Sequence, residues 1–385
     1  MRAYYLEKFP NQDYQIDTYM LFMEQGLYLT KEQGFWGMII PNPWLSNIFT
    51  KKLRRFMFSQ TSIHNLVHYT QKVFKRVTVD TETVIAQKGF MQDHIVTIDR
   101  IDTKKGSKTY KTFQEGWRAL DGEIVNVFMD DLTQNLIQKI DDVSEPLSTF
   151  CRVTVGIKPY QVGKGSPKQT QEIVEKRIYD ATHKVDGTYR SYLRGRDINR
   201  YALQPIEERW ISYGKWLAEP RLTANFNAPE KLLMRQTGDR PIAMLDTEQY
   251  LCLNNLHVIE LKGEIYDIRY ILGLVNSRLS DKYYETLNPE KGEALAEVKK
   301  TFVEQLPIRH LDLTNPTEKA QHDQLVNMVE KMLTLKKQQA AANDALNERR
   351  HELQEQIEYL DKRIDALVYE IYSLTKDEIR LLEGN

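Results

Sequence analysis

Residues 34–41, Gly-Phe-Trp-Gly-Met-Ile-Ile-Pro, decide how the first part of the chain folds. The apolar run inside this stretch is too short for a helix, and Gly34 and Pro41 bound it on both sides. A brief apolar run with such ends predicts a buried strand. We therefore expect a strand here, with the rest of the N-terminal region built around it.

Helical and strand-like patterns alternate around this strand. Apolar residues recur every three or four positions over 16–33, which predicts an amphipathic helix, and Ser46 can cap a second helix that runs through Phe56. Beyond them we expect a turn at 104–108 and a helix at 130–143. Further strands are predicted at 63–69, 83–88 and 95–101. This alternation is typical of an α/β fold.

The rest of the chain divides into a β-rich part and a helical tail. Short β-type runs alternate with turns over 151–310, with one helix predicted at 267–284. A helix is predicted at 317–342, and a second one carries an a/d seam of apolar residues. The seam consists of Leu346, Leu353, Ile357, Leu360, Ile364, Leu367, Ile371 and Leu374. A helical hairpin and a seam that pairs with another chain both remain open.

These patterns predict a mixed α/β chain of four segments. They are an α/β segment at 1–115, a helical linker at 116–150, a β-rich mixed domain at 151–310 and a helical hairpin or coiled-coil tail at 311–385.

The composition of the chain indicates in which cellular compartment it is expected. The 385 residues are 41% hydrophobic and 28% charged, and no apolar run approaches the roughly 18–20 residues that a membrane span needs. The first residues lack the apolar stretch of a signal peptide. Two cysteines, Cys151 and Cys252, are too few for a disulfide framework or a cysteine-rich zinc site. We therefore expect a cytoplasmic protein that binds no membrane.

Charge is distributed unevenly along the chain. The net charge is −1, but residues 151–200 hold eleven basic residues against five acidic ones. From residue 311 onward, ten basic residues face fifteen acidic ones. A basic middle beside an acidic tail indicates one domain that faces a polyanion and one solvated helical segment.

The basic middle supplies the candidate DNA-binding residues. Arginine donates in a fixed fork that fits phosphate oxygens or the O6 and N7 atoms of guanine, and lysines in a glycine-broken loop suit a DNA backbone. The candidates are Lys158, Tyr160, Lys164, Lys168, Arg190, Arg194, Arg196, Arg200, Arg235 and Arg240. In the alternative interpretation, Arg194 and Arg196 pair with Asp197 and nearby acids and brace the domain internally.

Four sequence blocks follow one another in the N-terminal 90 residues: IDTYMLFME at 16–24, GFWGMIIPNPWL at 34–45, LRRF at 53–56 and VFKRVTVDTETVI at 73–85. In this order they resemble the second half of a gamma-type N6-adenine DNA methyltransferase of the type IIG restriction–modification group. The resemblance implies that Phe74 stacks on an adenine flipped out of the duplex. The alternative is that Phe74 is an ordinary core residue.

The same comparison shows what this sequence lacks. It contains neither the glycine-rich loop that holds S-adenosylmethionine nor the Asn-Pro-Pro-Tyr loop that holds the adenine amine. The resemblance therefore implies a C-terminal portion that is inert alone, with no catalytic residue and no cofactor of its own. S-adenosylmethionine and the N-terminal methyltransferase half, from the same gene or a separate subunit, would complete the enzyme.

The middle of the chain resembles the TaqI-like C-terminal specificity domain, which recognises the DNA target. The most telling string is YRSYLRGRDINRY at 189–201, supported by VGIK at 155–158, KLLMR at 231–235 and YILGLVNSRL at 270–279. IDALVYEIYSLT at 364–375 is similar to the ending common in type IIG enzymes. The resemblance implies double-stranded DNA as the partner, and the seam leaves self-association open.

Two other functions compete with DNA recognition. A nuclease would need an acidic residue and a Glu-x-Lys on adjacent strands; Asp281 with Glu297 and Lys299 fits the letters, but that stretch predicts helix or loop. A phage-defence scaffold that uses the coiled seam is the other alternative. No metal site is predicted, because His64 and His68 fall in a β-type run. We expect a chain that recognises a DNA sequence and presents an adenine to a methyltransferase core.

Overall fold

A computed structural model describes residues 2–384 except 14, 72, 75–80, 102–105, 120–122, 126, 128–129, 205–206, 289–296 and 342–346. The chain forms two compact units, which we describe separately. The first contains Met1–Leu136 and Thr286–Glu293, and the second contains Ile137–Glu285 and Ala294–Asn385. The four segments predicted from the sequence are a finer division than these two units, and they remain a prediction.

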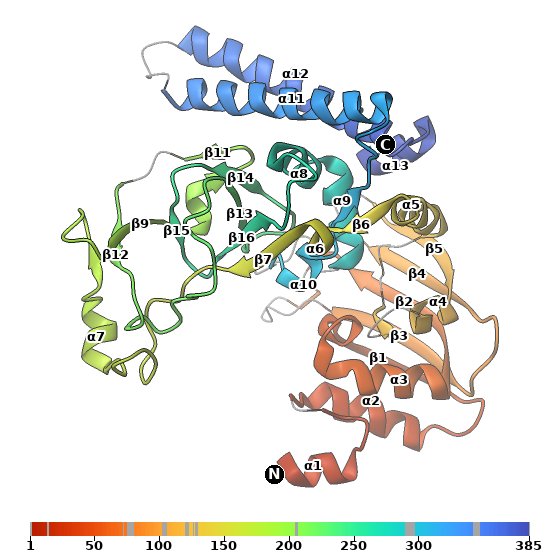
Figure 1. Ribbon diagram of the computed structural model, residues 1–385. Helices are drawn as coiled ribbons and strands as arrows, with labels where there is room; N and C mark the ends of the chain where they lie inside the picture. Colours follow the sequence, from red (N-terminus) through yellow and green to blue (C-terminus); the bar gives the residue numbers. More distant parts are fainter. Residues whose placement is uncertain are drawn as a thin grey trace. The chain divides into compact units, whose positions relative to one another are not determined.

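The first unit is built on one five-stranded sheet with the order β1-β3-β2-β4-β5. All pairs are antiparallel except β2 with β4. The strands are β1 (Phe35–Pro41), β2 (Thr61–Tyr69), β3 (Thr81–Lys88), β4 (Ile95–Ile101) and β5 (Lys108–Phe113). The helices are α1 (Arg2–Lys8), α2 (Thr18–Leu29), α3 (Lys51–Gln60) and α4 (Gln114–Ala119). Figure 1 shows α2 and α3 against the sheet, where Trp36 and Trp44 lie in the core.

The helices and strands predicted for the first unit are present, with one correction, whereas the turn predicted at 104–108 lies partly outside the described residues and β5 begins at Lys108. Ser46 does not cap the second helix: it follows a 3-10 turn at Asn42–Leu45, and α3 begins at Lys51. The cause is the buried guanidinium of Arg54, which donates to the carbonyl oxygens of Trp44 and Asn47 and so fixes a tight turn before the helix. Strand β5 escaped prediction because its lysines and threonines leave it mostly exposed at the sheet edge.

The second unit contains two four-stranded sheets that share one core. The first has the order β14-β13-β16-β7 and is antiparallel, and the second has the order β15-β9-β12-β8. Leu193, Leu233, Leu251 and Leu256 pack together in this core. The strands are β7 (Cys151–Val155), β8 (Asp180–Ala181), β9 (Tyr189–Leu193), β12 (Trp210–Ser212), β13 (Lys231–Arg235), β14 (Ala243–Asp246), β15 (Leu251–Cys252) and β16 (Leu256–Leu261).

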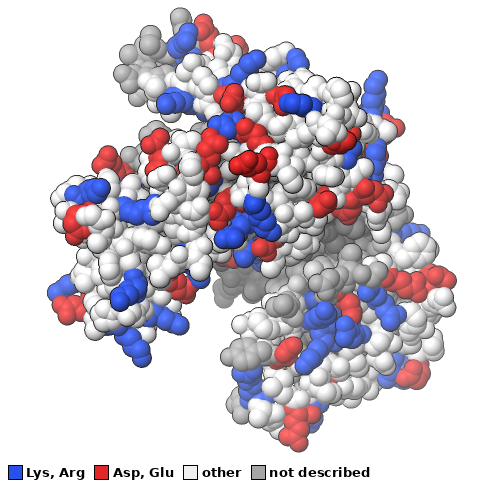
Figure 2. All heavy atoms as spheres, in the orientation of Figure 1, with Lys and Arg blue, Asp and Glu red and all other residues white. Residues whose placement is uncertain are grey.

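Shorter elements complete the second unit. Two strand pairs, β10 (Ile198–Asn199) with β11 (Ala202–Leu203) and β6 (Ser144–Pro146) with β17 (Pro307–Arg309), lie outside the large sheets. The short helices are α6 (Leu147–Phe150), α7 (Gln171–Lys176), α10 (Lys300–Val303) and α13 (Lys376–Glu383), and the chain enters the unit through α5 (Asp131–Asp141). Figure 2 shows basic and acidic side chains intermixed on the visible surface of each unit.

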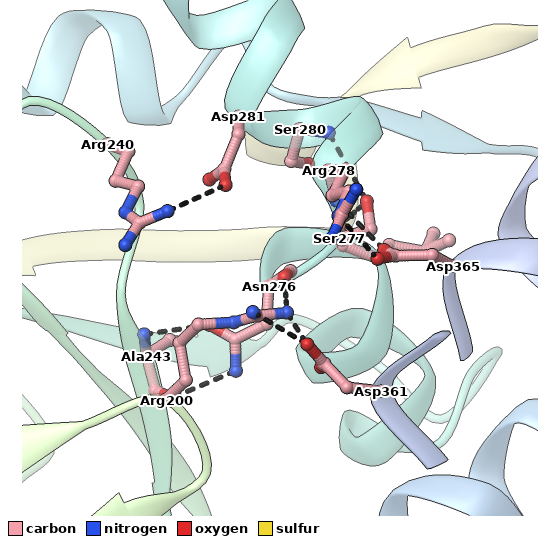
Figure 3. Close-up of polar contacts among 11 residues, drawn as sticks. Arg200, Arg240, Ala243, Asn276, Ser277, Arg278, Ser280, Asp281, Asp361 and Asp365 are labelled. Carbon is pink, nitrogen blue, oxygen red and sulfur yellow. Dashed lines mark hydrogen bonds and ion pairs between the residues drawn. The ribbon is translucent and has the colours of Figure 1, made fainter. Parts of the chain in front are cut away.

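The helix predicted at 267–284 is two helices, α8 (Ile268–Val275) and α9 (Arg278–Leu287). The break follows from Asn276, whose fully buried amide accepts a hydrogen bond from the Ala243 nitrogen at 2.9 Å and donates to the Ala243 oxygen at 3.0 Å. Figure 3 shows this amide against the backbone of β14. The hydroxyl of Ser277 then accepts from the Ser280 nitrogen and starts α9.

The tail forms a helical hairpin within one chain. Helices α11 (Pro316–Ala341) and α12 (Asn347–Ile371) pack side by side, and α11 also packs on α8. Seam residues Leu353, Ile357 and Ile364 are buried, while Leu346 lies outside the described residues. The hairpin is therefore the arrangement that the structure adopts. No helix in the described part of the chain has the length and apolar character to cross a membrane.

Replacing Asn276 with alanine should lower the free energy of unfolding by about 1–3 kcal/mol, because the buried Ala243 amide loses its partner. Urea unfolding followed by circular dichroism measures the change. Asn225→Ala is the control, since Asn225 is exposed. Equal losses in the two variants would contradict the role given to Asn276.

Candidate nucleic-acid interface

The loop that follows β7 is held rigidly by the segment around residues 215–219. Lys158 and Glu219 exchange two backbone hydrogen bonds, of 3.0 and 2.8 Å. Inside the loop, the buried amide of Gln169 donates to the oxygens of Pro159 and Trp216. A long loop with this many backbone partners holds in place the backbone that carries its surface side chains.

This loop presents lysines to solvent. Lys164 and Lys168 are exposed, as the sequence required of phosphate-binding residues, and the Ser166 nitrogen bonds the Lys215 oxygen at 2.9 Å. Lys215, which is also exposed, therefore joins the two predicted lysines. We call Lys164, Lys168 and Lys215 the lysine loop cluster. Within the described residues none of them forms an ion pair.

The two other candidates in this loop, Lys158 and Tyr160, form side-chain contacts within the protein. Lys158 is half-buried, and its Nζ donates to Gln161 at 2.8 Å. The Tyr160 ring stacks on Tyr179, and its hydroxyl donates to Asp180 at 3.1 Å. Burial raises the pKa of Tyr160, so the hydroxyl remains protonated and available as a donor. These contacts anchor the base of the loop.

The Arg-Gly-Arg-Asp turn is braced by an arginine that sequence reasoning missed. Asp197 accepts hydrogen bonds from both terminal nitrogens of Arg209, at 2.8 and 3.0 Å, and one from the Arg194 backbone nitrogen. Burial alone would raise the pKa of Asp197. The hydrogen bonds from Arg209 and Arg194 lower this pKa by more than burial raises it, so the carboxyl pKa lies below its ordinary value. The alternative interpretation, in which Arg194 and Arg196 pair with Asp197 and nearby acids, needs correction: within the described residues the ion pair of Asp197 is with Arg209, while Arg194 acts on Asp197 through its backbone nitrogen and its charge.

The remaining arginines of strand β9 and its turn differ in their contacts. Arg190 donates to the Gln249 oxygen at 2.8 Å and lies over the Tyr213 ring. The guanidinium of Arg194 lies over the Tyr192 ring and donates to its hydroxyl at 3.0 Å. Arg196 is exposed at the tip of the turn.

Arg200 and Arg240 bond to other parts of the second unit. Arg200 forms two hydrogen bonds with Asp361 of α12, at 3.0 and 3.1 Å, and donates to the Asn276 oxygen. Arg240 lies 3.6 Å from Asp281 of α9. Figure 3 shows both pairs. Arg200 therefore braces the tail, whereas Arg240 remains half-exposed beside its partner.

Phe74, the candidate for base stacking, lies in the first unit. Its ring is 44% exposed, so the alternative interpretation as an ordinary core residue is wrong. The residues that follow it, 75–80, lie outside the described residues. A stacking role for Phe74 stays a prediction.

The acidic residues considered for a nuclease do not lie on adjacent strands, as such a site would require. Asp281 lies on a helix and faces Arg240, while Glu297 forms an isolated β-bridge with Thr237. No group of three or more histidine, cysteine, aspartate or glutamate residues in the described ranges is arranged to hold a metal ion.

The expectation that this chain binds no S-adenosylmethionine by itself stays a prediction. Strand β1 runs directly into Pro41 and a 3-10 turn, and β2 is followed by Thr70 and Gln71 rather than glycines. Gly89 follows β3 at a positive φ, but it is a single glycine and not a glycine-rich loop. The ends of these three strands therefore do not fit this cofactor.

Comparison with known families confirms the two resemblances seen in the sequence. Residues 190–308 match the TaqI-like C-terminal specificity domain, and residues 1–74 match the Eco57I restriction-modification methylase. The chain is thus similar to restriction–modification methyltransferases that carry a TaqI-like specificity domain.

Two individual proteins are similar to this chain and have names that agree with these family matches. A protein of Methanocaldococcus jannaschii named as a type II restriction enzyme and methyltransferase is 23% identical over 379 residues, which are 93% of this chain and 29% of that protein. The type II restriction enzyme and methyltransferase Eco57I of Escherichia coli is 32% identical over 78 residues, 20% of this chain and 8% of its own. This chain therefore spans less than a third of either relative.

A solved structure shares the fold. The type IIL restriction-modification enzyme MmeI, determined in complex with DNA, superimposes with a TM-score of 0.58 at 13% identity. The match covers 100% of this chain and 54% of MmeI.

Arg209→Ala should lower the free energy of unfolding by about 2–3 kcal/mol at neutral pH, since the buried Asp197 carboxylate loses a charged donor. Because folding lowers the pKa of Asp197, this contribution is present above the ordinary aspartate pKa and disappears as the pH falls through the folded value. Urea unfolding of both proteins at pH 7 and at about pH 3 measures the difference.

The control is Arg380→Ala, which removes an exposed pair with Asp377 and should change stability by less than about 0.5 kcal/mol. A wild-type advantage over Arg209→Ala that stays equal at both pH values would refute the role of the Asp197 carboxylate.

Proposed function

We propose that residues 151–310 recognise a short sequence in double-stranded DNA for a type IIG restriction–modification methyltransferase. In this proposal the domain presents an adenine for methylation at N6, and S-adenosylmethionine is bound by a methyltransferase half outside these 385 residues. The match of residues 190–308 to a specificity domain and the DNA complex of MmeI support it.

The observation that carries the proposal is the lysine loop cluster. Lys164 and Lys168 are exposed on the loop, and Lys215 is exposed on the 215–219 segment that holds the loop backbone by hydrogen bonds. Exposed cations without acidic partners in the described structure are suited to replace the counterions that surround DNA phosphates, and the release of those ions drives binding. Phosphate contacts of this kind fix the register of a protein on the duplex.

Phe74 fits the proposal as the residue that stacks on the flipped adenine. An exposed aromatic ring gains free energy by stacking on a base that has left the duplex. The half of the methyltransferase that binds the cofactor would hold the rest of the adenine.

A protein-interaction scaffold has less support. That function would use the apolar seam of the tail, but α12 already buries most of this seam within the same chain. The nuclease alternative is weakened by the ion pair between Asp281 and Arg240.

The triple variant Lys164→Ala, Lys168→Ala and Lys215→Ala should bind all duplex sequences more weakly. Each phosphate contact contributes about 0.9 to the slope of log K against log salt, so the slope should become shallower by about 2–3. Titration of a labelled duplex at several salt concentrations, followed by fluorescence anisotropy, measures this slope.

A triple variant of Lys331, Lys337 and Lys362 is the matched control, since these exposed lysines lie on the tail and their removal changes the net charge equally. Its slope should stay at the wild-type value. Equal slopes for both triple variants, or no binding by the wild-type chain at low salt, would count against DNA recognition through this loop.

A further inference from the structure

The arginines of the second unit differ in whether the protein supplies a partner for the guanidinium. Arg200, Arg209 and Arg269 donate to carboxylates. In contrast, neither Arg194 nor Arg235 forms an ion pair with any described residue, although both are half-buried. The charge of Arg194 still helps to lower the pKa of the nearby Asp197, but neither guanidinium is held by a carboxylate in the way that Arg200, Arg209 and Arg269 are.

These two arginines lie on turns that meet each other. Asn255, between β15 and β16, joins the turns: its side-chain oxygen accepts from the Gly195 nitrogen at 3.0 Å, and its backbone oxygen accepts from the Gln236 nitrogen at 2.9 Å. A Cβ on Gly195 would lie 3.1 Å from the Asn255 oxygen and 3.4 Å from the Thr237 hydroxyl. Glycine is needed here because the backbones touch.

The direction of Arg235 follows from the alternation of strand β13. Arg235 lies two residues after Leu233, so both side chains project from the same face of the sheet. Leu233 packs in one cluster with Leu193 and Ile198, the residues that flank the Arg-Gly-Arg-Asp turn. Arg235 therefore projects from the sheet face that packs against this turn.

Three polar atoms on these turns are buried without a hydrogen-bond partner. They are the Nε atoms of Arg194 and Arg235 and the Oε1 atom of Gln236. Buried polar groups in native proteins are nearly always hydrogen-bonded, so these three atoms cost free energy as they stand. Because they are buried, a ligand pairs with them only after the side chains turn toward it. The set comprises two arginine donors and one amide acceptor.

We propose that Arg194, Arg235 and Gln236 form a reading site for one G·C base pair in the major groove. The inference rests on the proposed function, because it requires DNA as the ligand. Guanine offers O6 and N7 as acceptors to arginine, and the paired cytosine offers its N4 amine as a donor to Gln236. A phosphate group would satisfy the arginines but has no donor for the glutamine oxygen. The site therefore fits a base-pair edge better than a phosphate.

Two features prepare the site for this ligand. The guanidinium of Arg194 is positioned by the ring and hydroxyl of Tyr192, which limits the freedom it loses on binding. Asn255 fixes the separation of the two turns through backbone contacts. Arg196, exposed beside Gly195, is placed to meet an adjacent phosphate.

The test is selection of binding sites from a randomised duplex library by the full chain, followed by sequencing. The wild-type chain should enrich a motif that contains a G·C pair. Arg194→Ala, Arg235→Ala and Gln236→Ala should each reduce the preference at that same pair by about 5- to 150-fold, the range expected for a lost base contact. The other positions of the motif should keep their preferences.

Conservative variants distinguish the loss of a base contact from a defect in folding. Gln236→Glu keeps an acceptor for the cytosine amine and should retain the G·C preference, whereas Arg235→Lys keeps the charge but loses the fork and should relax it. Arg363→Ala and Gln354→Ala, which alter exposed residues of the tail, are the matched controls and should leave the motif intact.

The outcomes distinguish this inference from the proposed function. A wild-type motif that survives in all three alanine variants would overturn the reading site and leave DNA recognition standing. Uniformly weaker binding with unchanged preferences would assign these arginines to phosphate and also overturn it. A wild-type chain that enriches no motif would overturn both.

Discussion

The hydrogen bonds between the Asn276 side chain and the backbone of Ala243 join a helix break to a sheet of the second unit. The amide bonds the free edge of strand β14 as a neighbouring strand would, although it comes from the end of a helix. The Ala243 oxygen also accepts from the Tyr201 nitrogen at 2.9 Å, which fixes the turn between β10 and β11. The backbone groups of Ala243 thus join a sheet strand, a helix break and a turn, and the Asn276 side chain satisfies both its nitrogen and its oxygen.

The tail is attached through this same region. Arg200, next to Tyr201, donates both to the Asn276 oxygen and to Asp361 of α12, and Arg278 at the start of α9 pairs with Asp365. Burial raises the pKa of Asp365 to about 6, although the Arg278 backbone nitrogen donates to it. The hairpin is therefore bonded to the helix break by two arginine–aspartate pairs (Figure 3). This explains why the tail belongs to the same compact unit as the two sheets.

Local patterns predicted much of the fold, and contacts distant in sequence accounted for the errors. The strand after Gly34 and the apolar seam of α12 follow from hydrophobic periodicity, which is a property of neighbouring residues. The break at Asn276 could not be predicted, since its cause is a strand thirty-three residues earlier. Similarly, Lys215 joins the lysine loop cluster only through a backbone bond to Ser166, and the partner of Asp197 is Arg209 rather than its neighbours in the sequence.

The same contacts separate the roles of the basic residues. Sequence alone assigned the loop lysines to DNA phosphates and left the arginines between base contact and internal bracing, because it could not show what each side chain contacts. The structure divides them by what they contact: Arg200 is paired with a carboxylate, the lysine loop cluster faces solvent, and Arg194 and Arg235 are half-buried on turns joined by Asn255. A duplex offers two distinct kinds of ligand, exposed phosphates and recessed base edges. Backbone hydrogen bonds hold both the lysine loop and the joined turns. Under the proposed function, the side chains that would meet these two kinds of ligand can therefore change without loss of the fold.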